Sequence, residues 1–135
     1  MSNLLFKTAA SLCVLVLLAH ELLGAPMVLP PLSEAGVDEE VILLHHFSWH
    51  VGSVSVIAMA VMFFLASQRP QNHVLAVIAA GMSAGFCLLA FGLAVFVSGA
   101  MWGTPAPYFW SLIAILGGAG VVSSKSHNGP KLGGK

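Results

Sequence analysis

The sequence predicts an all-α fold, a four-helix transmembrane bundle. The chain has 135 residues, of which 58% are hydrophobic and only 7% are charged. A soluble domain carries roughly 25% charged residues, so this chain cannot build a water-facing surface. It contains four apolar segments separated by breaks that are polar or rich in proline. A helix needs about 20 mostly apolar residues to cross a bilayer, so the lipid bilayer is the expected surrounding of all four segments.

The first two spans are expected at residues 4–23 and 41–66. The stretch between them contains prolines, glycines and four of the five acidic residues, a composition that predicts an irregular connection. Asp38 is a suitable N-cap for the second span. Glu39 and Glu40 follow it and suit the positive end of the helix dipole.

The other two spans are expected at residues 74–99 and 105–124. The last span reaches the necessary length only if its first turn begins at Pro105. Proline is acceptable there because its missing N–H would be unpaired in a first turn. His73 precedes the third span and is expected to be solvated. Residues 125–135 are polar and glycine-rich, which predicts a disordered tail.

The positively charged residues predict that both termini are cytoplasmic, in a multi-pass protein of the cell (inner) membrane. Lys7, Arg69 and the three lysines after the fourth span all fall on one side in that arrangement, and cytoplasmic segments are enriched in Lys and Arg. The first span has an alternative interpretation as a cleaved signal peptide, because a positive residue precedes an apolar core. Against cleavage, Pro26 directly follows the small residues of "LGA".

Glycines indicate where the helices approach one another closely. In a membrane, contact between small residues replaces hydrophobic burial as the packing force. Gly81, Gly85 and Gly92 fall on one face of the third span, and Gly52 belongs to a comparable face of the second. This pattern predicts packing within the bundle or, alternatively, a homodimer or contact with a partner in a membrane complex.

The second span opens with "VILLHHFSWHVGS", a group of histidines in an otherwise apolar segment. His46 and His50 are four residues apart and share a helix face, which Ser53 extends. His45 is rotated by about 100° from His46 and projects toward Trp49.

The chain direction brings a second set of polar residues to the same place. His20 and Glu21 end the first span, and the second span begins at that same outer end of the bundle. Ionisable groups at membrane depth are costly, which makes them candidates for function. We expect His20 and His50 to be coupled across the two helices, and His45 to be the most dispensable histidine of the cluster.

Several interpretations of these histidines are open. They can be structural and join two helices by hydrogen bonds of about 0.6–2 kcal/mol each. They can bind zinc or copper, since histidines four apart with a third His and a nearby Glu are suitable ligands. They can hold haem b between His20 and His46 or His50. They can also serve proton-coupled transport, because imidazole titrates near neutral pH.

The sequence favours a non-enzymatic protein that binds a ligand or partner through this outer end, with no bound cofactor. It contains no nucleotide-binding loop, no G-x-S-x-G and no C-x-x-C motif, so no catalytic residue is assigned. The formal net charge is zero, which excludes a broadly basic face for nucleic acid.

The segments "AHELLGAPMVLPPL" and "FSWHVGS", within a four-span layout, resemble a group of small uncharacterised bacterial integral membrane proteins. Members carry a His near the end of helix 1, a Gly shortly after it, and a Trp-His pair with a small polar residue in helix 2. The matching residues here are His20, Gly24, Trp49, His50 and Ser53. The resemblance covers about the first half of the chain and implies the architecture, but no activity. An acidic residue often follows the glycine in that group, whereas this chain has Ala25.

Overall fold

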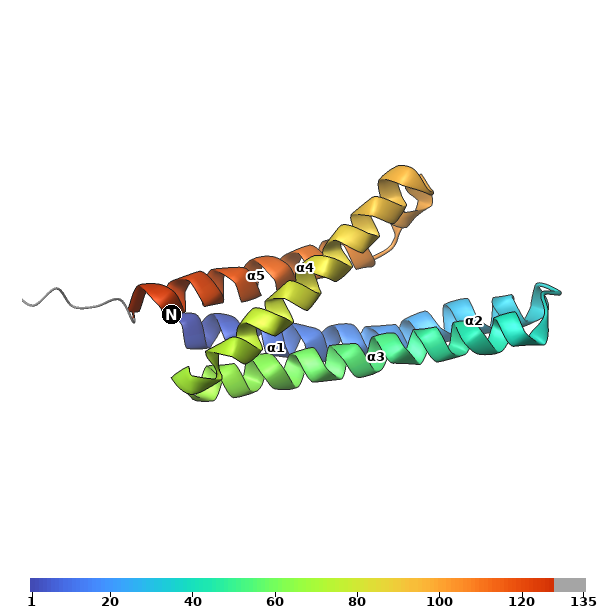
Figure 1. Ribbon diagram of the computed structural model, residues 1–135. Helices are drawn as coiled ribbons and strands as arrows, with labels where there is room; N and C mark the ends of the chain where they lie inside the picture. Colours follow the sequence, from blue (N-terminus) through green and yellow to red (C-terminus); the bar gives the residue numbers. More distant parts are fainter. Residues whose placement is uncertain (128–135) are drawn as a thin grey trace, which may run out of the picture.

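The computed structural model describes residues 1–127, and in these residues all regular structure is helical (Figure 1). Four helical segments are long and apolar enough to cross a membrane: Ser2–Glu34, Glu39–Gln68, Pro70–Phe96 and Ala106–Ser124. The predicted all-α bundle of four transmembrane helices is therefore confirmed. The side of the membrane on which the termini lie, and the identity of that membrane, stay predictions.

The first span is one continuous helical path of three elements: α1 (Ser2–Ala19), the π-helical turn η1 (His20–Gly24) and α2 (Ala25–Glu34). In the π-turn, the backbone N–H of Ala25 donates to the carbonyl of His20, five residues earlier. The predicted irregular connection from residue 24 onward is therefore wrong as far as Glu34.

The helix continues through three prolines. Pro26 lies at the start of α2, directly after the π-turn. Pro30 and Pro31 lie inside α2, where their rings hold φ close to a helical value but each removes one backbone N–H from the helix hydrogen bonds. The helical path ends just before Gly36, whose φ of +70° is a conformation that glycine adopts without strain.

The second span, α3 (Glu39–Gln68), returns antiparallel to the first. Asp38 holds the N-cap position, and its carbonyl accepts hydrogen bonds from the N–H groups of Val41 and Ile42. Its side chain makes no capping hydrogen bond, so the cap is a backbone one. At 1.5 Å per residue α3 is about 45 Å long, clearly more than the roughly 30 Å hydrocarbon core of a bilayer.

The last two spans form a second hairpin. The 3-10 turn η2 (Pro70–Asn72) leads into α4 (His73–Phe96), and the 3-10 turn η3 (Gly99–Gly103) leads into α5 (Ala106–His127). The first turn of α5 uses the carbonyl of Pro105, which accepts from two backbone N–H groups. At its other end α5 extends to His127, so it includes residues 125–127, which the sequence predicted to belong to a disordered tail. Residues 128–135 lie outside the described part of the chain.

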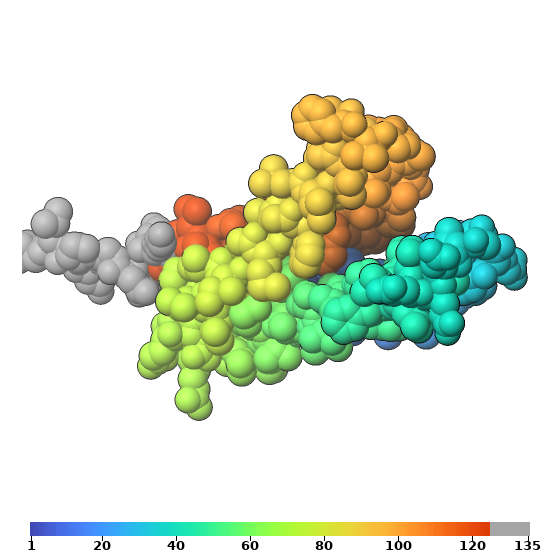
Figure 2. Space-filling model, turned by 45° about the vertical axis from the view of Figure 1, so that its right-hand side comes forward, coloured from blue at the N-terminus to red at the C-terminus, as the bar shows by residue number. Residues whose placement is uncertain are grey.

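The two hairpins meet at one end of the molecule. There α1 packs on α3 and α5, and α4 packs on the same two helices. The N-terminus, the α3–α4 connection and the end of α5 lie together at this end, which we call the terminal end (Figure 1). Toward the other end the α4–α5 hairpin diverges from α2 and the start of α3 (Figures 1 and 2).

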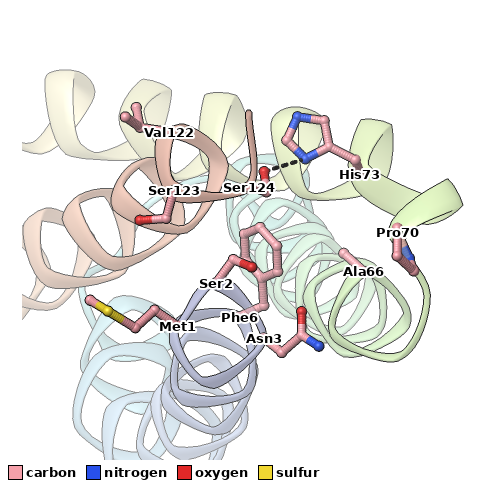
Figure 3. A pocket seen from close by; sticks show the side chains of 10 residues that line it. All are labelled: Met1, Ser2, Asn3, Phe6, Ala66, Pro70, His73, Val122, Ser123 and Ser124. Carbon is pink, nitrogen blue, oxygen red and sulfur yellow. Dashed lines mark hydrogen bonds between the residues drawn. The ribbon is translucent and has the colours of Figure 1, made fainter. Parts of the chain in front are cut away.

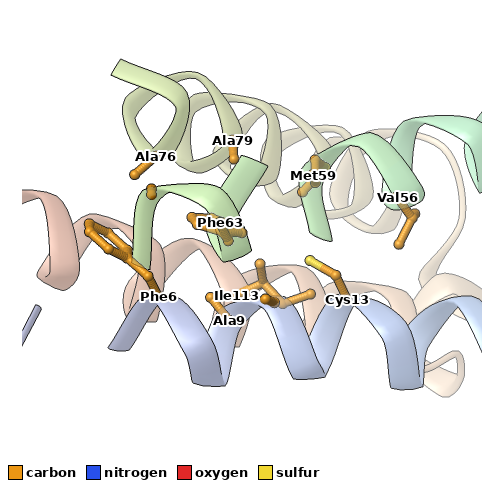
Figure 4. Packing of buried hydrophobic residues seen from close by; sticks show 11 residues of the cluster. Phe6, Ala9, Cys13, Val56, Met59, Phe63, Ala76, Ala79 and Ile113 are labelled. Atoms are coloured by element: carbon orange, nitrogen blue, oxygen red, sulfur yellow. The ribbon is translucent and has the colours of Figure 1, made fainter. Parts of the chain in front are cut away.

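The buried core lies between the hairpins (Figure 4). It combines a few large side chains with many small ones: Phe6, Ala9, Ala10, Cys13, Val56, Met59, Phe63, Ala66, Ala76, Ala79 and Ile113. The rings of Phe6 and Phe63 are stacked with centroids 6.4 Å apart. They lie against Gly120 and Gly117 of α5, respectively, where an added Cβ would lie only 2.5 Å and 2.7 Å from the ring atoms.

The glycine face of α4 does not pack against the rest of the bundle. A Cβ built on Gly81, Gly85 or Gly92 would have no neighbour within 4 Å. The predicted packing of these glycines within the bundle is therefore wrong. The helix instead turns a face of alanine and serine inward: Ala76, Ala79, Ser83, Ala90 and Ala94. These small side chains let α4 pack closely against the neighbouring helices. The glycine face of α4 is left for the membrane or for a second protein.

Candidate functional site

The candidate site lies where the π-turn meets α3. We call it the histidine layer and define it by His20, Glu21, His45, His46, Trp49, His50 and Ser53. Trp49 is about 28 Å along α3 from its end at Gln68. This length is close to the thickness of a bilayer core. If Gln68 marks one membrane boundary, the histidine layer lies at the opposite one.

The first contact in the layer joins His20 to Trp49. Their rings are stacked, with centroids 4.0 Å apart and planes inclined by 10°. Nε2 of His20 lies 3.3 Å from the carbonyl oxygen of Trp49, so its N–H donates to that carbonyl. Gly24 makes room for the indole, because a Cβ there would lie 3.1 Å from Cζ2 of Trp49. Gly52 is open toward the imidazole, since its Cβ would lie 3.9 Å from Nε2 of His20.

The second contact joins Glu21 to His50 and Ser53. The Ser53 hydroxyl donates to Oε1 of Glu21. Nδ1 of His50 lies 3.3 Å from the same oxygen. Within residues 1–127, this is the one contact with the geometry of an ion pair. No hydrogen bond in this part of the chain engages Oε2 of Glu21. Ser53 is buried, whereas the side chains of His50 and Glu21 are 56% and 31% exposed.

The structure changes the expected partnerships of the histidines. His20 and His50 approach the same level from opposite helices, as the chain direction predicted, but each has a different partner across the interface. His50 is exposed, although it is the histidine of α3 that lies farthest from the start of that helix. His46 is half-buried and has no hydrogen bond with the described residues.

His45 and Trp49 contribute unpaired nitrogen atoms. Their rings lie 6.4 Å apart and are inclined by 39°. Nε2 of His45 and Nε1 of Trp49 are both buried, and neither has a hydrogen-bond partner in the described part of the chain. Buried polar atoms are nearly always paired, so these two nitrogen atoms are exceptions among the described residues.

The described residues do not fit zinc, copper or haem b in this arrangement. Over residues 1–127, no three side chains of His, Cys, Asp or Glu lie close enough together to hold a metal ion. The indole of Trp49 covers one face of the His20 ring, and Nε2 of His20 is engaged by a carbonyl. An axial ligand needs a free ring nitrogen directed at the metal, so His20 would first have to leave Trp49.

A second polar contact lies at the terminal end and was missed in the sequence (Figure 3). His73 is half-buried rather than solvated, and its Nδ1 forms a 2.8 Å hydrogen bond with Oγ of Ser124. The pair borders a cavity of about 660 Å³ between α1, α5, the end of α3 and the turn that leads into α4. The two residues are 51 positions apart in the chain, and no sequence pattern indicates that they are in contact.

Comparison of the chain with protein-family models, with curated proteins and with solved structures found no match. The resemblance to small bacterial membrane proteins therefore stays a prediction, and the function has to be argued from the histidine layer itself.

Proposed function

We propose that this chain is a non-enzymatic, multi-pass protein of the cell membrane that binds a ligand or partner through its histidine layer. The proposal rests on the hydrogen bonds and the exposure of the Glu21 carboxylate. Its Oε1 accepts two hydrogen bonds, while its Oε2 accepts none from the described residues and the side chain is partly exposed. The available oxygen suits an ammonium group or another hydrogen-bond donor.

A purely structural clamp would be built differently. Polar groups that only join two helices are best enclosed between them, because a carboxylate at the membrane is costly unless it is fully paired. Here the acidic side chain and its histidine partner are accessible from outside the bundle. These features favour recognition of another molecule over a role in stability alone.

Proton-coupled transport receives less support from the packing. A transporter needs polar groups or water along a path through the bundle. Between the histidine layer and the terminal end, the described core is filled by apolar side chains, among them Met59, Phe63 and Ile113, which are fully buried. A site at one membrane boundary fits binding better than passage.

The proposal can be tested with a simple amphipathic amine. Octylammonium partitions into the membrane boundary and presents a donor to Glu21. We expect it to change the fluorescence of Trp49 saturably in protein reconstituted in nanodiscs, with Trp102 and Trp110 replaced by Phe. The response should be lost in Glu21→Gln, which keeps the shape of the side chain but removes its charge.

The matched control is Glu34→Gln, which removes the same charge at an exposed position at the end of α2. This variant should respond as the unmodified protein does. A linear, unsaturable response, or an equal response in the Glu21 variant, would show only partition into lipid and would contradict the proposal.

A further inference from the structure

A surface groove runs along the α1–α3 interface in the half of the bundle near the terminal end. It has a volume of about 530 Å³. Four residues of each helix line it: Lys7, Ala10, Ser11 and Val14 from α1, and Ala60, Val61, Phe64 and Gln68 from α3. The small side chains of Ala10, Ser11 and Ala60 leave the hollow, and the larger side chains form its walls. The groove shares no residue with the histidine layer.

The groove is polar at one end and apolar at the other. The helices are antiparallel, so Lys7 and Gln68 both lie toward the terminal end, while Val14 and Val61 lie toward the middle of the bundle. From Lys7 to Val14 the groove extends about 10 Å along the helix axis. A phospholipid has the same order of groups along its length, with a charged phosphate at the surface and an acyl chain directed inward.

The charge at the polar end defines the class of lipid. Lys7 is exposed and makes no ion pair with any described residue. The amide of Gln68 gives one N–H to Ser67, at 3.1 Å, and has a second N–H to donate. Arg69 follows directly and is also exposed. We propose that the groove binds one anionic phospholipid, with its phosphate at Lys7 and Gln68 and one acyl chain lying toward Val14.

A second copy of this chain is a less suitable occupant. Two copies inserted with the same topology would place both Lys7 side chains at the same depth. A symmetric contact along this groove would then bring two equal charges to the same level of the membrane, where they repel each other. An anionic lipid instead neutralises the charge and fills the hollow, and basic sites between membrane helices bind such head groups.

Native mass spectrometry of the full chain in mild detergent tests the proposal. The probes are phosphatidylglycerol, which is anionic, and phosphatidylcholine, which has no net charge. We expect the first to bind more tightly, and Lys7→Gln to weaken its binding about five-fold, the usual contribution of one basic residue near a membrane surface. Ala60→Phe should reduce binding of both lipids by filling the groove.

A matched control accompanies these variants. Ala84→Leu enlarges an exposed residue of α4 away from the groove. It should bind phosphatidylglycerol as the unmodified chain does. Circular dichroism and size-exclusion chromatography identify variants that have lost the fold; Lys7→Gln alters an exposed side chain and should retain it.

Three results would overturn the assignment: equal binding of the two lipids, unchanged binding by Lys7→Gln, or a dimer that Ala60→Phe dissociates. The last of these would assign the groove to a second copy of the chain.

Discussion

The contact between Gly120 and Phe6 allows a sharp test of how closely α5 approaches α1. A Cβ at Gly120 would lie 2.5 Å from Cε1 and 2.7 Å from Cδ1 of Phe6. The phenyl ring cannot simply move aside, because it is only 2% exposed and stacks on Phe63. Gly118, two residues earlier in the same helix, has no neighbour within 4 Å of an added Cβ. The two glycines therefore form a matched pair.

The magnitude follows from the difference between two substitutions. Replacing glycine by alanine in a helix gains up to about 1 kcal/mol from helix propensity, and this gain is common to Gly120→Ala and Gly118→Ala. Only the first inserts a methyl group into a filled core, which costs about 1–3 kcal/mol. We therefore expect Gly120→Ala to be less stable than Gly118→Ala by about 1–3 kcal/mol.

The measurement is reversible unfolding in mixed micelles at increasing SDS, followed by circular dichroism. Phe6→Leu provides an internal check, because a smaller side chain should relieve the crowding at Gly120. The double variant should then lose less stability than the sum of the single variants. Equal stability of the two alanine variants, or strict additivity with Phe6→Leu, would refute the close approach of α5 to α1.

Three further outcomes are expected. A double-mutant cycle with Glu21→Gln and Ser53→Ala should give a coupling of about 0.6–2 kcal/mol in thermal stability, and a value near zero would mean that this hydrogen bond does not form. Gly85→Leu and Ala84→Leu should change the thermal stability of the monomer equally, since both positions are exposed. A larger loss of stability in Gly85→Leu would place the glycine face in a contact within the bundle. A reporter inserted at Ser33 should lie outside the cell and reporters at both chain ends inside, as labelling with an impermeant reagent would show; the reverse pattern would contradict the orientation.

The fold class could be predicted from the sequence because hydropathy alone determines it. A chain with so few charges has to place its apolar segments in lipid, and short breaks make successive helices antiparallel. The same chain direction correctly predicted that His20 and Glu21 would meet the start of α3. Prolines misled the prediction of the first connection, since they are compatible with a first turn and even with the interior of α2.

The partners within the site could not be predicted, because helix faces depend on tertiary packing. Small residues occur on several faces of α4 and α5, and the sequence does not show which face meets a neighbour. The large rings of Phe6 and Phe63 decide it, since only Gly120 and Gly117 leave room for them. In the histidine layer, a stack with Trp49 and a bond to its carbonyl determine the position of His20.

The π-turn at His20–Gly24 makes the length of this segment as important as its composition. A π-turn holds one residue more than the corresponding α-helical turn, and each residue of an α-helix rotates the chain by about 100°. The side chains of α2 are therefore out of phase with α1 by about that angle. An uninterrupted α-helix of the same length would rotate Gly24 away from Trp49, whereas deleting one residue together with the π-turn would keep the phase of α2. Substitutions that favour a regular α-helix without removing a residue would therefore separate Gly24 from the indole that it now accommodates.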